Sequence, residues 1–155
     1  MDPINILVGV NLIATMGANI SSTKDNLKSS MTRVMKKPDS LLQKLPLNLA
    51  AFLILLQILG IFNLGTLKNF DIEYGQTEMI IRLIGLVLFA VFSWLQIKSF
   101  KILGDNYSQE VVILKSHKLI QKGFYKYIRH PQYLFQMLAD LGAGIALLSY
   151  LIIPV

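Results

Sequence analysis

The sequence predicts an all-α protein whose helices cross a membrane four times within a single domain, residues 1–155. Hydrophobic residues make up 54% of the 155 residues and the mean hydropathy is positive, a composition too apolar for a soluble domain of this size. Four apolar runs have about the 20 helical residues that a hydrocarbon core requires. The predicted spans are residues 3–23, 45–67, 79–97 and 132–155.

The first two runs contain no charged residue. Residues 3–23 carry three asparagines, so one side of this span is expected to pack against other helices. A signal peptide is disfavoured, because no basic residue precedes the run. In the second run, Pro46 falls in the first turn, where the missing backbone N–H costs nothing.

The last two runs each contain one charged residue. Arg82 lies near the start of the third run, and we expect its guanidinium to extend to the membrane interface. Asp140 lies inside the fourth run, where a carboxylate commonly faces a cavity or a partner. It is expected to face a cofactor pocket, to pair with a polar residue such as Asn11, or simply to pack between helices. Small residues four positions apart predict close helix packing there: Ala139 with Ala143, and Gly142 with Ala146.

Basic residues gather in two of the three connections, with six in residues 24–44, one in residues 68–78 and seven in residues 98–131. Cytoplasmic loops of membrane proteins carry an excess of lysine and arginine. We therefore expect loops 24–44 and 98–131 to be cytosolic and the amino terminus to lie outside. Because the cations follow the loops, the lipid bilayer explains the formal charge of +6 better than a nucleic acid does.

The longer basic loop contains the residues that can carry chemistry. Its residues 109–114 form a short β-prone stretch. The chain has no cysteine, so disulfides, thiolate metal sites and cysteine nucleophiles are excluded. Two histidines with no nearby carboxylate pair are a weak metal signal, and no metal site is predicted.

The loop ends in the cationic, tyrosine-rich stretch GFYKYIRHPQY, residues 123–133. Pro131 disfavours a helical conformation at His130 and suits the first turn of the following helix. The unpaired N–H groups at that helix start, together with Arg129, form a candidate site for a carboxylate or phosphate. Composition alone favours a different interpretation of the stretch, an interfacial anchor that contacts anionic headgroups.

Residues 117–133, HKLIQKGFYKYIRHPQY, resemble the H-x-L-V-x-x-G-x-Y-x-x-x-R-H-P-x-Y signature of the isoprenylcysteine carboxyl methyltransferase family. Upstream, LGDNYS at residues 103–108 is similar to the L-G-x-x-W-S element of that family, with tyrosine in place of tryptophan. The resemblance implies a multi-span methyltransferase that binds S-adenosylmethionine at the cytosolic surface and receives a lipidic or prenylated substrate from the bilayer. The implied cofactor-binding residues are His117, Leu119, Ile120, Gly123, Tyr125, Arg129, His130, Pro131 and Tyr133.

Among these residues, Arg129 and His130 are the implied catalytic, positioning pair. Gly123 allows close backbone approach, Tyr125 and Tyr133 offer stacking faces for adenosine, and Arg129 at the helix start can hold the methionine carboxylate. A carboxylate acceptor is already ionised at neutral pH and needs alignment rather than a base, which favours a prenylcysteine-type carboxylate. An amine acceptor would need a base, for which His130 or His117 are candidates.

Other functions share parts of this pattern. The R-H-P-x-Y core also occurs in membrane methyltransferases that act on phospholipid amines and in some sterol reductases, which implies a phospholipid amine methyltransferase or an NADPH-dependent reductase as alternatives. A non-catalytic membrane module that contacts anionic lipid is a third. In the family a further span and a cytosolic tail follow the fourth apolar run, and we expect this sequence to lack both, together with the closing half of the site.

Overall fold

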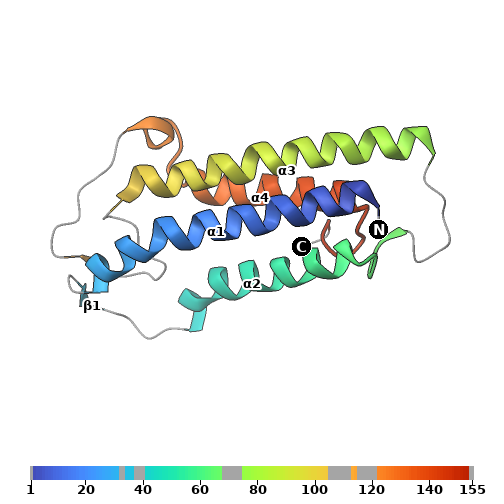
Figure 1. Cartoon of the computed structure of the whole chain (residues 1–155). Coiled ribbons are helices and arrows are strands. Elements are labelled where there is room, and N and C mark those ends of the chain that lie inside the picture. Colours follow the sequence, from blue (N-terminus) through green and yellow to red (C-terminus); the bar gives the residue numbers. More distant parts are fainter. Residues whose placement is uncertain are drawn as a thin grey trace.

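The structure, a computed structural model, describes residues 2–31, 34–36, 41–67, 75–104, 113–114 and 122–153. Its described part contains four long helices, which confirms the predicted all-α class (Figure 1). They are α1 (Pro3–Met31), α2 (Leu41–Ile61), α3 (Gln76–Leu103) and α4 (Pro131–Leu147). The shorter elements are β1 (Val34–Lys36), β2 (Ile113–Leu114) and the 3-10 helix η3 (Gly123–Lys126).

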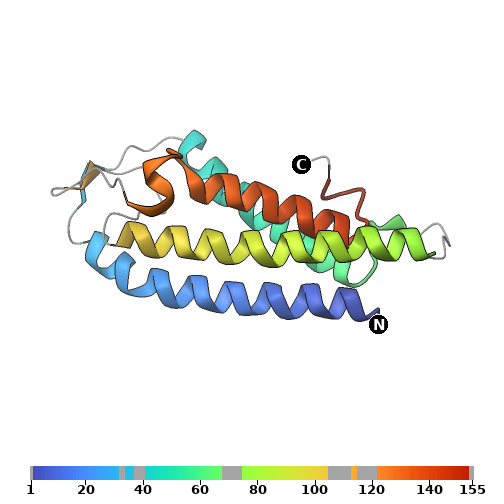
Figure 2. The same cartoon turned by 90° about the horizontal axis from the view of Figure 1, so that it is seen from above.

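Successive helices run in opposite directions along one bundle (Figures 1 and 2). One end, which we call the motif end, holds the last turns of α1 and α3, the first turns of α2 and α4, and η3. The other end, the far end, holds the amino terminus and the last turn of α2. The two segments predicted to be cytosolic therefore adjoin the same end of the molecule.

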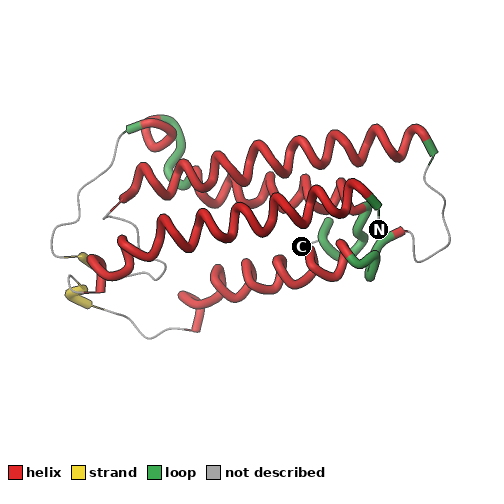
Figure 3. The backbone as a smooth tube through the Cα atoms, viewed as in Figure 1, coloured by secondary structure: helices red, strands yellow, loops and turns green. Residues whose placement is uncertain are grey.

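A small pair of strands lies at the motif end (Figure 3). β1 and β2 pair antiparallel, with Val34 opposite Leu114 and Lys36 opposite Ile113. The β-prone stretch predicted at residues 109–114 is thus a strand at its last two residues, and residues 109–112 lie outside the described part. The pair links the segment before α2 to the segment before η3 without changing the helical class.

Helices α3 and α4 pack backbone against backbone. A Cβ atom added to Gly142 would lie 2.5 Å from the backbone nitrogen of Phe89, and one added to Gly85 would collide with the backbone nitrogen of Ala146. Real Cβ atoms are not found at such separations, so only glycine permits this crossing. Ala139, Ala143 and Ala146 are fully or almost fully buried, which confirms that the small residues of the fourth run serve helix packing.

The surface of the bundle is apolar and much of its interior is polar. Large hydrophobic side chains on α1, α2, α3 and α4 are exposed, among them Ile13, Val87 and Met137. Buried positions include Asn5, Gln57, Arg82, Ser93, Gln96 and Asp140. Water-soluble proteins show the opposite distribution, whereas a helix bundle surrounded by lipid has no reason to bury its apolar side chains.

Two described helical segments are long and apolar enough to cross a membrane, Pro3–Ser21 of α1 and Gln76–Leu103 of α3. The apolar part of α2, Asn48–Ile61, is shorter. α1 and α3 extend well beyond the spans predicted for them, whereas α2 stops at Ile61, six residues before the predicted end of its span.

The fourth predicted span, 132–155, is not one continuous helix. α4 ends at Leu147, and Leu148 adopts a left-handed conformation with φ 48°. The chain then turns, and Ser149 forms an isolated bridge with Thr66, while the Ser149 hydroxyl donates to the carbonyl of Gly65 at 3.0 Å. Apolar composition continues beyond Leu147, but these contacts with the end of α2 stop the helix there.

The prediction that Arg82 reaches the interface is wrong. Its side chain is 1% exposed and donates to the carbonyl of Ala146 at 2.9 Å, to a carboxylate oxygen of Asp2 at 2.7 Å and to the amide oxygen of Asn5 at 2.8 Å. Asn5 in turn donates to the carbonyl of Ile61 at 3.0 Å. The guanidinium stays buried because a carboxylate and two carbonyl-type oxygens satisfy it. It joins α3 to α1 and α4 directly, and Asn5 extends the network to the end of α2.

Candidate functional site

The short helix η3, which begins the stretch of residues 123–133, packs against the last turns of α3 and the first turns of α4. Gly123 has φ +58°, a conformation that side-chain-bearing residues rarely adopt, and a Cβ there would lie 2.8 Å from the Ile102 side chain. The Phe124 ring meets the Phe135 ring edge to face at 5.0 Å, and the Lys98 ammonium lies 5.9 Å from the Phe124 centroid. These contacts hold η3 against the bundle.

The hydroxyl of Tyr125 is used inside this turn. It donates to the side-chain oxygen of Gln132 at 2.9 Å and lies 3.4 Å from the carbonyl oxygen of Ser99. Tyr125 thus links η3 to both α3 and α4. Gln132 occupies the variable position of R-H-P-x-Y, so pattern matching alone did not single it out.

Helix α4 begins directly after Arg129 and His130. His130 is the N-cap residue and makes no side-chain capping hydrogen bond, while Pro131 is buried in the first turn as predicted. The N–H groups of that turn consequently lack a capping side chain and carry the positive end of the helix dipole. The helix start therefore favours a negatively charged group next to Arg129.

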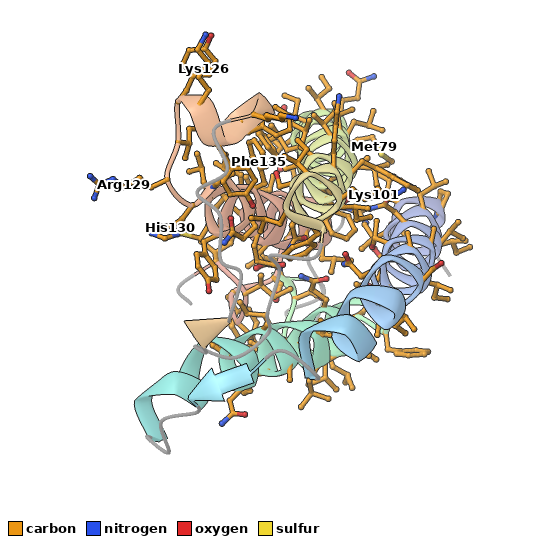
Figure 4. The ribbon with its side chains drawn as sticks, turned by 90° about the vertical axis from the view of Figure 1, so that its left-hand side faces the viewer. Met79, Lys101, Lys126, Arg129, His130 and Phe135 are labelled. Carbon is orange, nitrogen blue, oxygen red and sulfur yellow. The ribbon has the colours of Figure 1, made fainter. Side chains whose placement is uncertain are left out.

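Three residues of the signature are accessible together at this helix start. Arg129 and His130 are exposed, and Tyr133 is 54% exposed, with its ring 5.9 Å from that of His130. In Figure 4, Arg129, His130 and Lys126 lie at the outer edge of the bundle, whereas Phe135 lies among the helices. The structure thus separates the accessible residues of the motif from those that anchor it.

The remaining predicted cofactor-binding residues, His117, Leu119 and Ile120, lie outside the described residues. Of the upstream element, Leu103 ends α3 and Gly104 caps it with φ +49°, while Tyr107 and Ser108 are also outside the described part. The structure therefore places six of the nine predicted residues, those from Gly123 to Tyr133, around the junction of η3 and α4.

Asp140 lies deeper in the bundle and belongs to a separate polar cluster. Its carboxylate accepts from the amide of Gln57 at 2.7 Å and from the amide of Gln136 at 2.8 Å and 2.9 Å. Gln136 also accepts a short hydrogen bond from Gln96. The suggested pairing with Asn11 is wrong, because Asn11 donates to the hydroxyl of Ser93.

The Asp140 cluster favours the helix-packing interpretation of that residue. It joins α2, α3 and α4 through neutral amides, and Asp140 follows His130 by ten residues, about 15 Å along a helix. The four-residue spacing of Gln132, Gln136 and Asp140 was a sequence signal for one polar face of α4, and it would have identified Gln136 as a partner of Asp140. Within the described residues, no group of three potential metal ligands is present.

Residues 83–154 match the model of the Isoprenylcysteine carboxyl methyltransferase (ICMT) family. The matched region contains most of α3, all of η3 and α4, and every residue of the predicted site. Over these residues the chain is similar to the ICMT family. The resemblance drawn from the sequence signature is confirmed. No curated protein matches the chain.

The match to the ICMT family indicates a membrane methyltransferase, and the two long apolar helices agree with a membrane location. Members of the family depend on S-adenosylmethionine. In this chain the described part of the family signature, residues 123–133, lies at the exposed junction of η3 and α4. This junction is therefore the candidate active site of the ICMT region.

Proposed function

We propose that this ICMT-family protein transfers a methyl group from S-adenosylmethionine to a lipidic acceptor, specifically to a prenylcysteine-type carboxylate. The observation that carries the proposal is the geometry of the signature. Arg129, His130 and Tyr133 are accessible together at an uncapped helix start, at the end of the bundle where apolar helices give way to polar segments.

The residues at this junction fit S-adenosylmethionine. Arg129 and the first-turn N–H groups of α4 are suited to the carboxylate of the methionine portion, because both favour an anion. The exposed Tyr133 ring beside His130 offers a stacking face for the adenine. Tyr125 ties η3 to the first turn of α4, since its hydroxyl donates to Gln132.

When bound, S-adenosylmethionine supplies an electrophilic methyl group attached to a sulfonium. A carboxylate oxygen of the acceptor forms the new bond to the methyl carbon while the carbon–sulfur bond breaks and its electron pair stays on sulfur. The products are a methyl ester and a thioether. No proton has to move, because the acceptor carboxylate is already ionised near neutral pH.

The described side chains agree with a reaction of this kind. At the junction of η3 and α4 they provide cations, an imidazole and phenol rings, whereas the acidic side chains that the structure describes, Asp2, Glu78 and Asp140, lie elsewhere. The junction can therefore bind anions and orient them. Arg129 is expected to bind a carboxylate rather than approach the sulfonium, because like charges repel.

Titration calorimetry of the detergent-purified full chain with S-adenosylhomocysteine tests the proposal. The wild-type protein is expected to bind, and Arg129→Ala is expected to weaken binding at least about tenfold, as loss of a charge-assisted hydrogen bond does. Lys126→Ala is the matched control, since Lys126 is an exposed cation of the same turn outside the family signature. It should leave the dissociation constant unchanged.

Two outcomes would overturn the proposal. The first is the absence of binding by well-folded wild-type protein, and the second is an equal dissociation constant for wild type and Arg129→Ala. A parallel titration with NADPH identifies the reductase alternative if NADPH binds in place of S-adenosylhomocysteine. Methyl-ester formation on a prenylcysteine probe, compared with methylation of a phospholipid amine, then decides the acceptor.

A further inference from the structure

The exposed side chains of α3 change from apolar to cationic toward the motif end. Its side chains at positions 87, 91, 94, 98 and 101 follow the three- and four-residue spacing of one helix face, and all five are exposed. Val87, Val91 and Trp94 are apolar, whereas Lys98 and Lys101 are cationic. The change from aliphatic to aromatic to cationic side chains is the order expected from hydrocarbon to headgroup.

Helix α4 shows the same order independently. Leu141, Met137 and Tyr133 are exposed at four-residue intervals, and the next step of four leads to Arg129, which is also exposed. Two neighbouring helices therefore change from apolar to aromatic to cationic at the same end of the bundle.

The cations at this end are numerous, and none of them forms an ion pair with a described acidic side chain. Lys98, Lys101, Lys122, Lys126 and Arg129 are all exposed, and we call these five residues the basic collar. The ion pair found among the described residues, between Arg82 and Asp2, lies at the far end. Glu78 also lies near that end, in the first turns of α3. Among the described side chains, exposed cations therefore concentrate at the motif end, away from Asp2 and Glu78.

We propose that the basic collar binds the phosphate groups of anionic phospholipids in the surrounding bilayer. The partner is a lipid rather than a nucleic acid or an acidic protein, because the cations continue directly from the apolar stripes of α3 and α4. Exposed aromatic residues adjoin these cations: Tyr127, 82% exposed, follows Lys126, and Trp94, 49% exposed, lies one helical turn before Lys98. Lysine and arginine near an anionic membrane surface attract it by about 1 kcal/mol each, which is about fivefold per residue.

The proposal goes beyond methyl transfer. Anionic lipid bound to the basic collar would fix the depth of the junction of η3 and α4 in the bilayer. It would also determine at which leaflet the motif end lies. It can be tested without any cofactor, so its failure is distinct from failure of the proposed activity.

Native mass spectrometry of the full chain, released from micelles containing equal amounts of phosphatidylglycerol and phosphatidylcholine, measures the lipid preference. The wild-type protein is expected to retain phosphatidylglycerol preferentially. The triple variant Lys101→Gln, Lys122→Gln, Lys126→Gln should reduce this preference at least about fivefold. Lys98 is kept because its ammonium contacts Phe124, and Arg129 because it belongs to the candidate active site.

Two matched variants separate charge from structure. The triple Lys→Arg variant at the same three positions should retain the preference, and Glu78→Gln at the other end of α3 should leave it unchanged. The helical circular dichroism and elution volume of each protein report its folding. If the Gln triple does not fold, the single variants Lys101→Gln and Lys126→Gln are measured instead, each with a smaller expected reduction.

Equal retention of the two lipids by the wild-type protein would overturn the proposal, as would an undiminished preference in the folded Gln variants. The third measurement adds inorganic phosphate as a competitor of the bound lipid. If it displaces phosphatidylglycerol at concentrations comparable to that of the lipid, the collar is a general phosphate site and the assignment to phospholipid is overturned.

Discussion

At the scale of single residues, the guanidinium of Arg82 organises the far end of the bundle. It contacts a carboxylate from before α1, an amide oxygen from α1 and a carbonyl from α4. A buried arginine with a carboxylate and two further acceptors is stable because each of its polar groups keeps a partner. Removal of the cation would leave these acceptors without their donors.

Arg82→Leu is therefore expected to destabilise the protein by about 3–5 kcal/mol, the usual loss when one partner of a buried ion pair is removed. The measurement is unfolding of the detergent-purified protein by sodium dodecyl sulfate, followed by circular dichroism. The double variant with Asp2→Asn should recover part of the loss, because the unpaired carboxylate is then absent. Glu78→Gln, which changes a charge on the same helix, serves as control, and an unchanged midpoint in Arg82→Leu would contradict the role assigned to the ion pair.

The candidate site shows what residue patterns can and cannot reveal. The signature predicted Arg129, His130 and Tyr133 as site residues, and the structure brings these three exposed side chains together at the start of α4. The contact of Tyr125 with Gln132 was not found, since it depends on how η3 folds back onto α4. Site residues that act through a neighbour are visible only once that neighbour has been placed.

At the scale of elements, the crossing of α3 and α4 positions the motif. Gly85 of α3 lies against the backbone of α4, and Gly142 of α4 lies against the backbone of α3. The two helices therefore approach more closely than larger residues would allow. The junction of η3 and α4 is then held against the last turns of α3 through Phe124, Phe135 and Tyr125. The short distance between the backbones of α3 and α4 therefore sets the position of the candidate active site.

Gly142→Ala is expected to destabilise the protein by about 1–3 kcal/mol, because the added methyl group cannot be accommodated beside Phe89 without moving α3. The same unfolding assay in sodium dodecyl sulfate measures the change. Gly17→Ala is the matched control, since a Cβ atom there would meet nothing within 4 Å and alanine favours a helix. A larger loss in Gly17→Ala than in Gly142→Ala would contradict the packing argument.

At the scale of the whole molecule, the bundle is asymmetric from end to end. The segments predicted to be cytosolic adjoin the motif end, and the amino terminus lies at the far end. A membrane protein with this arrangement should place its basic collar in the cytosol, following the excess of cations in cytoplasmic loops.

The absence of native cysteine permits a direct measurement of orientation. In intact cells, a membrane-impermeant maleimide should label Glu78→Cys at the far end and should label Lys126→Cys at the motif end only after permeabilisation. The unsubstituted protein is the control for background labelling. Labelling of Lys126→Cys in intact cells, with protection of Glu78→Cys, would reverse the predicted topology.

The sequence by itself determined the helical class, the resemblance to the ICMT family and the residues of the signature, because apolar runs and short motifs are local properties of the chain. Only the tertiary structure decided the partners of Arg82 and Asp140 and the end of α4 at Leu147. The bonds from Arg82 to Asp2 and from Gln57 to Asp140 join residues 80 and 83 positions apart. Such pairs depend on how whole helices pack, and no local pattern of hydrophobicity or charge encodes that packing.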